Sequence, residues 1–190
     1  FRKERANNRK TWMNNFNGAP PTDPNNEHIT YEDFINKDLI MFSLATVRRA
    51  IPSVVDGLKP SQRKVLYSCF KRNLVKEIKV AQLAGYVSEH SGYHHGEMSL
   101  MGAIIGMAQN YVGSNNINLL YPKGQFGTRI QGGNDHASPR YIFTYLNSIT
   151  KILFPDQDKP LLTYLEDDGM SIEPEFYAPI LPTVLINGCN

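Results

Sequence analysis

The hydrophobic residues change their spacing near Ile117, and this change restricts the folds that the chain can adopt. Before that point they recur at helical intervals, as in the stripe formed by Val65, Leu66, Cys69 and Phe70. After it, short apolar pieces are separated by glycines, which suit tight turns and a close approach of the backbone to a large ligand. The order of the two patterns predicts an α+β fold that is mainly helical.

Helix start signals divide the first part of the chain. Thr30 and Asp33 resemble a capping box and introduce an amphipathic helix of about three turns. Pro60 fits the first position of another helix, and two more helices are predicted over residues 80–89 and 96–111. Three such helices with short connections and basic residues are typical of a helix-turn-helix or winged-helix unit. The same pattern also suits any small helical bundle.

The remaining segments are less regular. Residues 2–15 predict a frayed or linking helix, and residues 17–28 have the composition of a linker. Residues 117–121 and 128–131 predict short strands between glycines, and the acidic stretch 156–175 leads to a hydrophobic strand near the C-terminal end.

Length and composition exclude several classes of protein. A chain of 190 residues with 41% hydrophobic residues can fill a substantial core. Cys69 and Cys189 lack CxxC spacing, so we expect neither a disulfide framework nor a zinc knuckle, and a reducing compartment. The uncharged run 98–122 contains amides that a bilayer would leave unpaired, so no membrane span is expected. Because Phe1 follows no initiator methionine or signal peptide, we expect a segment of a longer polypeptide.

The net charge of +2 conceals an uneven distribution. Residues 1–80 carry 15 Lys and Arg against 8 Asp and Glu, residues 81–140 carry 3 against 3, and residues 141–190 carry 2 against 7. This asymmetry favours a polyanion-binding face on one side of the molecule. An ordinary solvated surface explains it equally well.

Arg140 and Tyr141 are neighbours at the end of the glycine-rich loop. A phenol has a reference pKa of about 10, so only about one in a thousand is ionised at pH 7. A guanidinium about 4 Å away offers an attraction that offsets this deficit at an effective dielectric constant of about 20. Arg140 could therefore help Tyr141 act as a nucleophile and neutralise a phosphoryl transition state. An isolated pair of this kind is more often a packed tyrosine beside a surface arginine.

Two adjacent histidines precede the third predicted helix. His94, His95 and Glu97 could ligate a metal, but neighbours in sequence point apart and no further ligand occurs at metalloprotease spacing. A histidine placed just before a helix is better suited to donate a hydrogen bond to a phosphate or an oxyanion. A histidine pair that only caps the helix is an equally good structural alternative.

Lys59, Arg63 and Lys64 place cations at the start of the helix that begins at Pro60. Alone, this is a common surface sequence. It lacks the glycines of a P-loop, and no dinucleotide-binding fingerprint occurs elsewhere, so ATP hydrolysis within this segment is not supported.

Taken together, six motifs closely resemble the DNA-gate region of eukaryotic-type DNA topoisomerase II, a type IIA family. They follow one another in the family's order without large gaps, and the YHHGE motif lacks the extra proline of the gyrase-like version. Residues 43–50 differ from the cellular enzymes and leave a divergent protist or viral source open. The motifs occupy residues 51–66, 80–85, 93–97, 109–116, 124–129 and 138–141.

The resemblance implies a winged-helix domain whose Tyr141 attacks a DNA phosphodiester, forms a 5′-phosphotyrosyl link and frees a 3′-hydroxyl. By position, Arg140 would stabilise the pentavalent phosphate and His95 would hydrogen-bond it. Arg49 and Lys59 resemble basic residues that hold the cleaved strand. Further cations would contact only the DNA backbone, which makes binding dependent on salt; these are Arg63, Lys64, Lys71, Lys123 and Arg129.

The resemblance also implies an organisation for the chain and its partners. Residues 1–28 would link from a preceding metal-binding domain, residues 29–145 would form the winged-helix domain, and residues 146–190 would begin a mixed α/β tower domain. The whole enzyme would be an ATP-dependent homodimer acting on double-stranded DNA, with no metal ligands in this segment. Mg²⁺ and ATP would bind in domains upstream. The expected location is the nucleus, or a cytoplasmic replication site for a viral protein.

Two alternatives remain at this point. A non-catalytic winged-helix module would use Arg140 and Tyr141 only for packing or phosphate contact, and would never form a covalent adduct. A metal-dependent hydrolase centred on His94, His95 and Glu97 would need a tightly bound metal.

Overall fold

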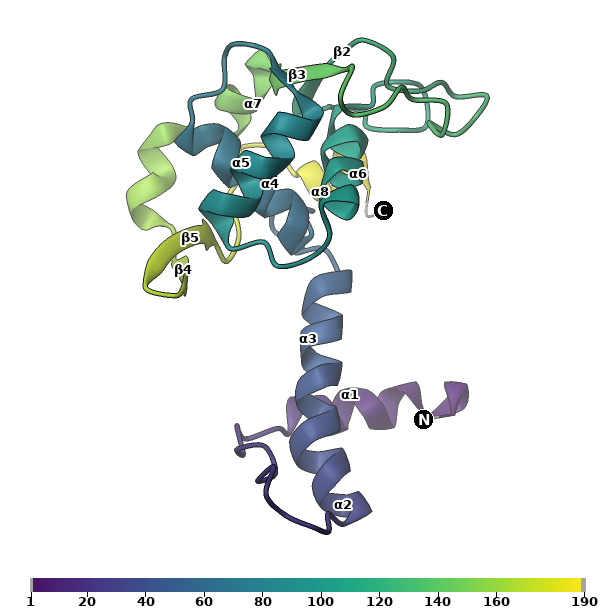
Figure 1. The fold of residues 1–190 in the computed structure, drawn as a ribbon, viewed down its shortest axis with the longest axis vertical. Helices are drawn as coiled ribbons and strands as arrows, with labels where there is room; N and C mark the ends of the chain where they lie inside the picture. Colours follow the sequence, from purple (N-terminus) through teal and green to yellow (C-terminus); the bar gives the residue numbers. More distant parts are fainter. Residues whose placement is uncertain (1, 189–190) are drawn as a thin grey trace. The chain divides into compact units, whose positions relative to one another are not determined.

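The computed structural model describes residues 2–188. Contacts divide the chain into two compact units, residues 1–51 and residues 52–190 (Figure 1). The boundaries expected after residues 28 and 145 separate functional domains and stay predictions. No helix in the described part of the chain is long and apolar enough to cross a membrane.

Unit 1 is helical. Its elements are η1 (Lys3–Arg5), α1 (Ala6–Asn14), α2 (Tyr31–Asp33), the π-helical η2 (Phe34–Leu39) and α3 (Ile40–Ala50). The Thr30 hydroxyl accepts the Asp33 amide at 3.0 Å, which confirms the predicted helix start. From there α2, η2 and α3 run without a break to Ala50, well beyond the three turns expected. Trp12 of α1 donates to Asn36 Oδ1 at 2.9 Å and so joins α1 to this helix.

Three helices that contact one another form the centre of unit 2. They are α4 (Pro60–Lys71), α5 (Val80–Ser91) and α6 (Glu97–Ala108), close to the predicted ranges. Pro60 occupies the first turn of α4, where its missing N–H costs no hydrogen bond. The side chain of Gln62 accepts the Lys59 amide at 2.9 Å and caps the same end.

A three-stranded antiparallel sheet packs beside these helices. Its strands are β1 (Ile78–Lys79), β2 (Leu120–Lys123) and β3 (Phe143–Leu146), in the order β1–β3–β2. Alternation along β3 separates two faces: Thr144 and Leu146 are buried, whereas Phe143 and Tyr145 are only half-buried. Three helices with such a sheet are the arrangement expected for a winged-helix unit.

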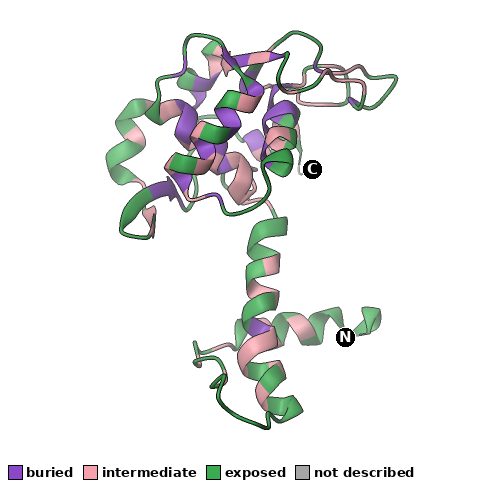
Figure 2. Cartoon of the chain, in the orientation of Figure 1, coloured by how far each residue is buried: buried purple, intermediate pink, exposed green. Residues whose placement is uncertain are grey.

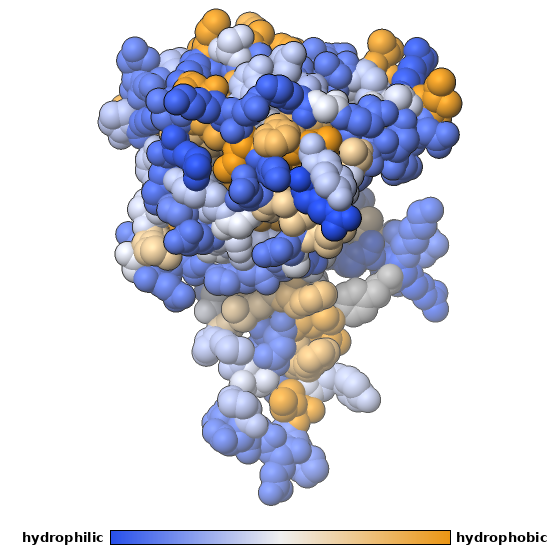
Figure 3. Space-filling model, turned by 45° about the horizontal axis from the view of Figure 1, so that its top comes forward, coloured by the Kyte–Doolittle hydropathy of each residue, from blue (hydrophilic) through white to orange (hydrophobic). Residues whose placement is uncertain are grey.

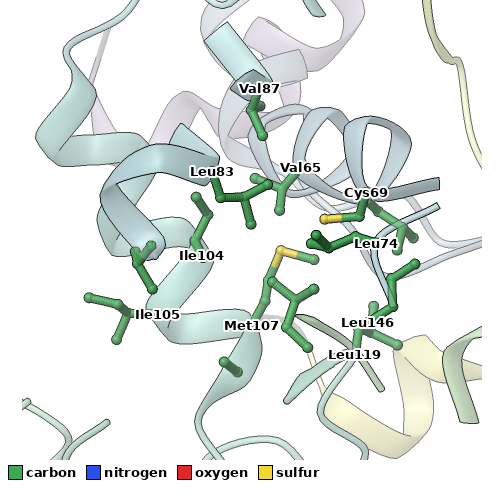
Figure 4. Packing of buried hydrophobic residues seen from close by; sticks show 14 of the residues in the cluster. Val65, Cys69, Leu74, Leu83, Val87, Ile104, Ile105, Met107, Leu119 and Leu146 are labelled. Atoms are coloured by element: carbon green, nitrogen blue, oxygen red, sulfur yellow. The ribbon is translucent and has the colours of Figure 1, made fainter. Parts of the chain in front are cut away.

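The core of unit 2 lies between the helices and the inner face of the sheet. Figure 2 shows its buried residues concentrated there, and Figure 4 shows Val65, Leu83 and Met107 among the side chains that point toward one another. Cys69 is completely buried in this cluster, and burial raises the pKa of its thiol to about 12. Cys69 is therefore a packing residue; Cys189 lies outside the described residues.

The C-terminal part of unit 2 wraps back onto α4. It comprises α7 (Ser148–Leu153), the 3₁₀-helical η3 (Asp156–Leu161), β4 (Tyr164–Asp167), β5 (Met170–Pro174) and α8 (Thr183–Asn187). The β4–β5 hairpin is held by an ion pair between Lys64 and buried Glu173 at 2.9 Å and by Tyr67, whose hydroxyl donates to the Ser171 carbonyl at 3.0 Å.

Asp56 connects the turn before α4 to the C-terminal segment. Its carboxylate accepts two bonds from Arg63, at 2.8 and 2.9 Å, and the amides of Leu58 and Tyr177, both at 2.9 Å. Its carbonyl accepts the Thr183 hydroxyl at 2.8 Å. Asp56 and Arg63 are 1% and 5% exposed, so this is a buried and well-satisfied ion pair.

Two strand predictions are wrong. Residues 128–131 form a turn, because Gly127, Gly132 and Gly133 have positive φ angles and the Asp135 carboxylate binds the amide of residue 128. The hydrophobic end of the chain forms the short helix α8, whose start is fixed by the bond from Thr183 to Asp56. The strand expected at residues 117–121 is present but shifted to β2.

We expect Asp56→Asn to lower the free energy of unfolding by about 3–5 kcal/mol, because it leaves the buried Arg63 guanidinium without a counter-charge. Asp156→Asn is the control, since it removes a carboxylate from an exposed pair with Lys159 and should cost about 1 kcal/mol at most. Urea denaturation followed by near-UV circular dichroism measures both. Equal effects would show that the buried pair adds nothing beyond a surface pair.

Candidate active site

Tyr141 is presented at the surface of unit 2 beside a cation. The residue is 65% exposed, and the Arg140 guanidinium carbon lies 4.9 Å from the centre of the phenol ring. The amide of Tyr141 donates to the Ser138 carbonyl at 2.9 Å, which closes a tight turn just before β3. The phenolic hydroxyl and the guanidinium are therefore both available to one external group.

The backbone on both sides of this pair is bound to the start of α5. The amide of Val80 donates to the Ile142 carbonyl at 3.0 Å, and the amide of Ala81 donates to the Pro139 carbonyl at 3.2 Å. Amides in the first turn of a helix have no partner within the helix, so these two bonds also satisfy α5. Buried Ile142 closes the anchor: a Cβ at Gly124 would approach its Cγ2 to 2.9 Å.

The glycine-rich loop before Tyr141 is held by polar contacts. The Asp135 carboxylate accepts the Thr128 amide at 2.7 Å and its hydroxyl at 2.8 Å. The Thr128 amide is the main reason why the pKa of Asp135 lies below its ordinary value. Gln109, just after α6, donates to the Phe126 carbonyl at 2.9 Å and to that of Gly133 at 3.3 Å. The loop therefore has a defined conformation although most of it is exposed.

His95 is exposed directly before α6. Its ring meets that of buried Tyr93 edge-on, with the centroids 5.4 Å apart. The neighbouring His94 points elsewhere, because its Nε2 lies 3.0 Å from Asp167 Oδ2 on β4. Within residues 2–188 the structure records no hydrogen bond or ring contact between His95 and the Arg140–Tyr141 pair. The two histidines thus have different partners, as expected for neighbours in sequence.

The predicted phosphate-binding cations fall into two groups. Arg63 and Lys64 are bound inside unit 2, to Asp56 and to Glu173, and this burial argues against the phosphate contacts predicted for them. Lys59 is half-buried at the start of α4, and Arg49 is exposed in the last turn of α3 in unit 1.

The other predicted cations lie at the surface. Lys71 and Arg129 are exposed, and Lys123 pairs with Glu77 on the exterior. Sequence reasoning missed Lys79, which is exposed at the start of α5 and lies 5.9 Å above the Phe143 ring. Its position immediately before the apolar start of α5 was the available signal, but the strand pairing that brings it to Phe143 is not visible in the sequence.

The metal-centre alternative gains no support from the described part of the chain. No group of three or more His, Cys, Asp or Glu side chains gathers there in a way that could hold a metal ion. Residues 2–188 therefore do not fit a Mg²⁺ site, and no step of the chemistry below passes through a metal in this segment.

Comparison with known proteins identifies the family. The family model of DNA gyrase/topoisomerase IV matches residues 49–190, and that of the C-terminal associated domain of TOPRIM matches residues 1–47. The chain belongs to the type II DNA topoisomerase family. The two family models meet within a few residues of the division between units 1 and 2.

Individual topoisomerases match along the entire chain. It is 59% identical to DNA topoisomerase 2 of Arabidopsis thaliana and 56% identical to human DNA topoisomerase 2-alpha, covering 100% of this chain and 13% of each relative. The crystal structure of the Plasmodium falciparum topoisomerase II DNA-binding, cleavage and re-ligation domain matches with a TM-score of 0.88 and 54% identity, covering 100% of this chain and 26% of that one. The predicted family and the predicted fold class are thereby confirmed.

Gly133→Ala should loosen the loop of this topoisomerase segment that precedes Tyr141. A Cβ at Gly133 would approach Gln109 Nε2 to 2.4 Å and the Tyr111 hydroxyl to 2.6 Å, at a φ of +82°. Gly132→Ala is the control, because its φ of +57° is also positive but its Cβ would meet open space. We expect amide hydrogen exchange at Thr128 to become about tenfold faster in Gly133→Ala than in Gly132→Ala. Equal exchange rates would contradict the packing described here.

Proposed function

We propose that this chain is the DNA breakage–reunion segment of an ATP-dependent type II topoisomerase, and that Tyr141 is its nucleophile. The observation that carries the proposal is the anchored loop, which holds an exposed phenol beside a guanidinium in a chain of this family. The chain spans only 12–13% of the relatives it matches, so the activity of the whole protein belongs to the proposal.

In the proposed reaction the Tyr141 oxygen attacks a phosphorus atom of the DNA backbone. A new O–P bond forms, the bond from phosphorus to the 3′-oxygen breaks, and that oxygen leaves as a hydroxyl after taking a proton. The phenol gives up its proton to solvent or to a neighbouring base. The product is a 5′-phosphotyrosyl ester, which is close in energy to the original diester. Reversal by the 3′-hydroxyl therefore reseals the strand without ATP.

Arg140 supports this step through its charge. Negative charge accumulates on the non-bridging oxygens as phosphorus becomes pentavalent, and a guanidinium can donate two parallel hydrogen bonds to them. The ring contact of 4.9 Å keeps the guanidinium beside the nucleophile before DNA arrives. The anchors at Pro139 and Ile142 limit the motion of both residues, so little ordering is needed on binding.

His95 would donate a hydrogen bond to the same phosphate. Its exposed position before α6 leaves the ring nitrogens accessible, and the amides of the first turn of α6 favour an anion nearby. Lys59, Arg49, Lys123 and Arg129 would hold the DNA backbone on either side, which predicts binding that weakens with salt.

The rest of the proposed machinery lies outside the described residues. A homodimer would place two such tyrosines on opposite strands of duplex DNA, so that a second duplex can pass through the break. Mg²⁺ and ATP would bind elsewhere in the whole protein, and the nucleus is its proposed location.

Tyr141→Phe should abolish covalent protein–DNA complexes, because the variant lacks the attacking oxygen. The assay incubates the full-length protein with supercoiled plasmid and recovers protein-linked DNA after denaturation. Tyr31→Phe, which alters another exposed tyrosine, should behave like wild type. Persistent adducts in Tyr141→Phe would exclude Tyr141 as the nucleophile. Salt-sensitive binding without any adduct in wild type would favour the non-catalytic module.

His95→Ala should lower the rate of DNA cleavage about 100-fold, as expected for the loss of one donor to a transition-state oxygen. His94→Ala is the matched control, because its ring binds Asp167 and has no proposed contact with the phosphate. Its rate should change much less. Rapid-quench cleavage of a labelled oligonucleotide measures both rates, and equal losses would refute a specific role for His95.

A further inference from the structure

The outer face of the β1–β3–β2 sheet carries a row of side chains that the proposed reaction does not use. In the strand register Lys79 and Lys123 both lie opposite Phe143, and Tyr121 lies opposite Tyr145. Residues directly opposite in a sheet project from the same side, so these five residues share one face. We call them the aromatic–lysine face.

The aromatic rings of this face are ordered and accessible. Tyr121 and Tyr145 stack with their centroids 4.7 Å apart and their planes inclined by 18°. Tyr121 is 44% exposed, and Phe143 and Tyr145 are half-buried. The stack therefore presents flat apolar surface in a conformation that is already fixed.

Two cations flank the rings. The Lys79 ammonium lies 5.9 Å from the Phe143 ring centre, and Lys123 pairs with Glu77. The hydrogen bond from Glu77 raises the pKa of Lys123, so this lysine remains charged at neutral pH. Figure 3 shows that the surface at this end of unit 2 is largely hydrophilic, with apolar side chains gathered between the polar ones.

This face is continuous with the candidate active site. Tyr141 lies two residues before Phe143 on the same chain, and a strand advances about 3.3 Å per residue. A DNA strand joined to Tyr141 would therefore have its first nucleotides within reach of the lysines. Exposed aromatic rings with adjacent lysines are the combination that binds unpaired strands, because every free base has a flat face to stack.

We propose that the aromatic–lysine face binds an unpaired stretch of DNA next to the phosphate that Tyr141 attacks. Lys79 and Lys123 contact its phosphates, and Tyr121 with Tyr145 provides a platform for a base. The proposal rests on the proposed function, since it takes the occupant to be the DNA strand joined to Tyr141. Duplex DNA keeps its bases stacked and would use only the lysines.

The first experiment measures how tightly the full-length protein binds fluorescein-labelled oligothymidylate of about 16 nucleotides, a length that covers a typical single-strand site. Tyr121→Ala combined with Tyr145→Ala should weaken binding about tenfold, with a much smaller effect on a duplex of the same length. Lys159→Gln is the control, because this lysine also lies over an aromatic ring, 6.0 Å from Phe70, but on another surface. Unchanged binding in the double variant would overturn the proposal.

The salt dependence of binding tests the lysines. Lys79→Gln should reduce the slope of log K against log salt concentration by about 0.7 with the single strand, the value expected for one lost phosphate contact. Glu77→Gln releases Lys123 from its ion pair and should strengthen binding. A loss of slope with duplex alone, or no change in either variant, would refute an unpaired strand as the occupant.

A third measurement locates the contact. An oligonucleotide carrying 5-iodouracil beside the cleavage position should cross-link on irradiation to Tyr121, Phe143 or Tyr145, as mapped by mass spectrometry. Cross-links only to other residues would contradict the proposal. Adduct formation by Tyr141 is scored separately on plasmid: its absence in wild type is a failure of the proposed function, whereas normal adducts without these cross-links are a failure of this inference alone.

Discussion

The buried ion pair between Asp56 and Arg63 is the constraint on which the rest of unit 2 depends. Two charges removed from water are tolerated only when nearly all their hydrogen bonds are made, and the Asp56 carboxylate accepts four. Because these bonds reach α4, the turn before it and the amide of Tyr177, one carboxylate joins segments 121 residues apart. A hydrophobic pair of similar size would fill the space without fixing how those segments meet.

From that pair, order extends step by step to the candidate site. Arg63 holds the first turn of α4, α4 packs on α5, and the first amides of α5 bind the carbonyls on both sides of Arg140 and Tyr141. The reactive side chains can therefore be exposed while their backbone is fixed, an arrangement that suits a nucleophile for a large substrate. The pair with Glu173 holds the β4–β5 hairpin to the same helix through Lys64.

Much of the fold could be predicted from local signals, because caps, prolines and apolar spacing act over a few residues. The starts at Thr30 and Pro60 were found in this way, whereas the turn at residues 128–131 was mistaken for a strand. Its conformation depends on Asp135, seven residues away, and on Gln109 from the end of α6. The Arg140–Tyr141 pair was found because its members are adjacent in sequence, while Lys79 meets Phe143 only through β pairing.

The cations show most clearly why a sequence pattern alone cannot assign a phosphate-binding surface. Lys59, Arg63 and Lys64 lie within six residues, yet α4 turns Arg63 toward Asp56 and Lys64 toward Glu173 and leaves only Lys59 near the surface. A helix advances about 100° per residue, so neighbouring cations project in different directions and their partners decide their roles. Positive charge that is neutralised inside the domain adds stability there and little to DNA affinity. The charge left to attract a polyanion is therefore smaller than the basic sequence indicates, and it includes Arg140 and Lys79, on either side of the anchored loop.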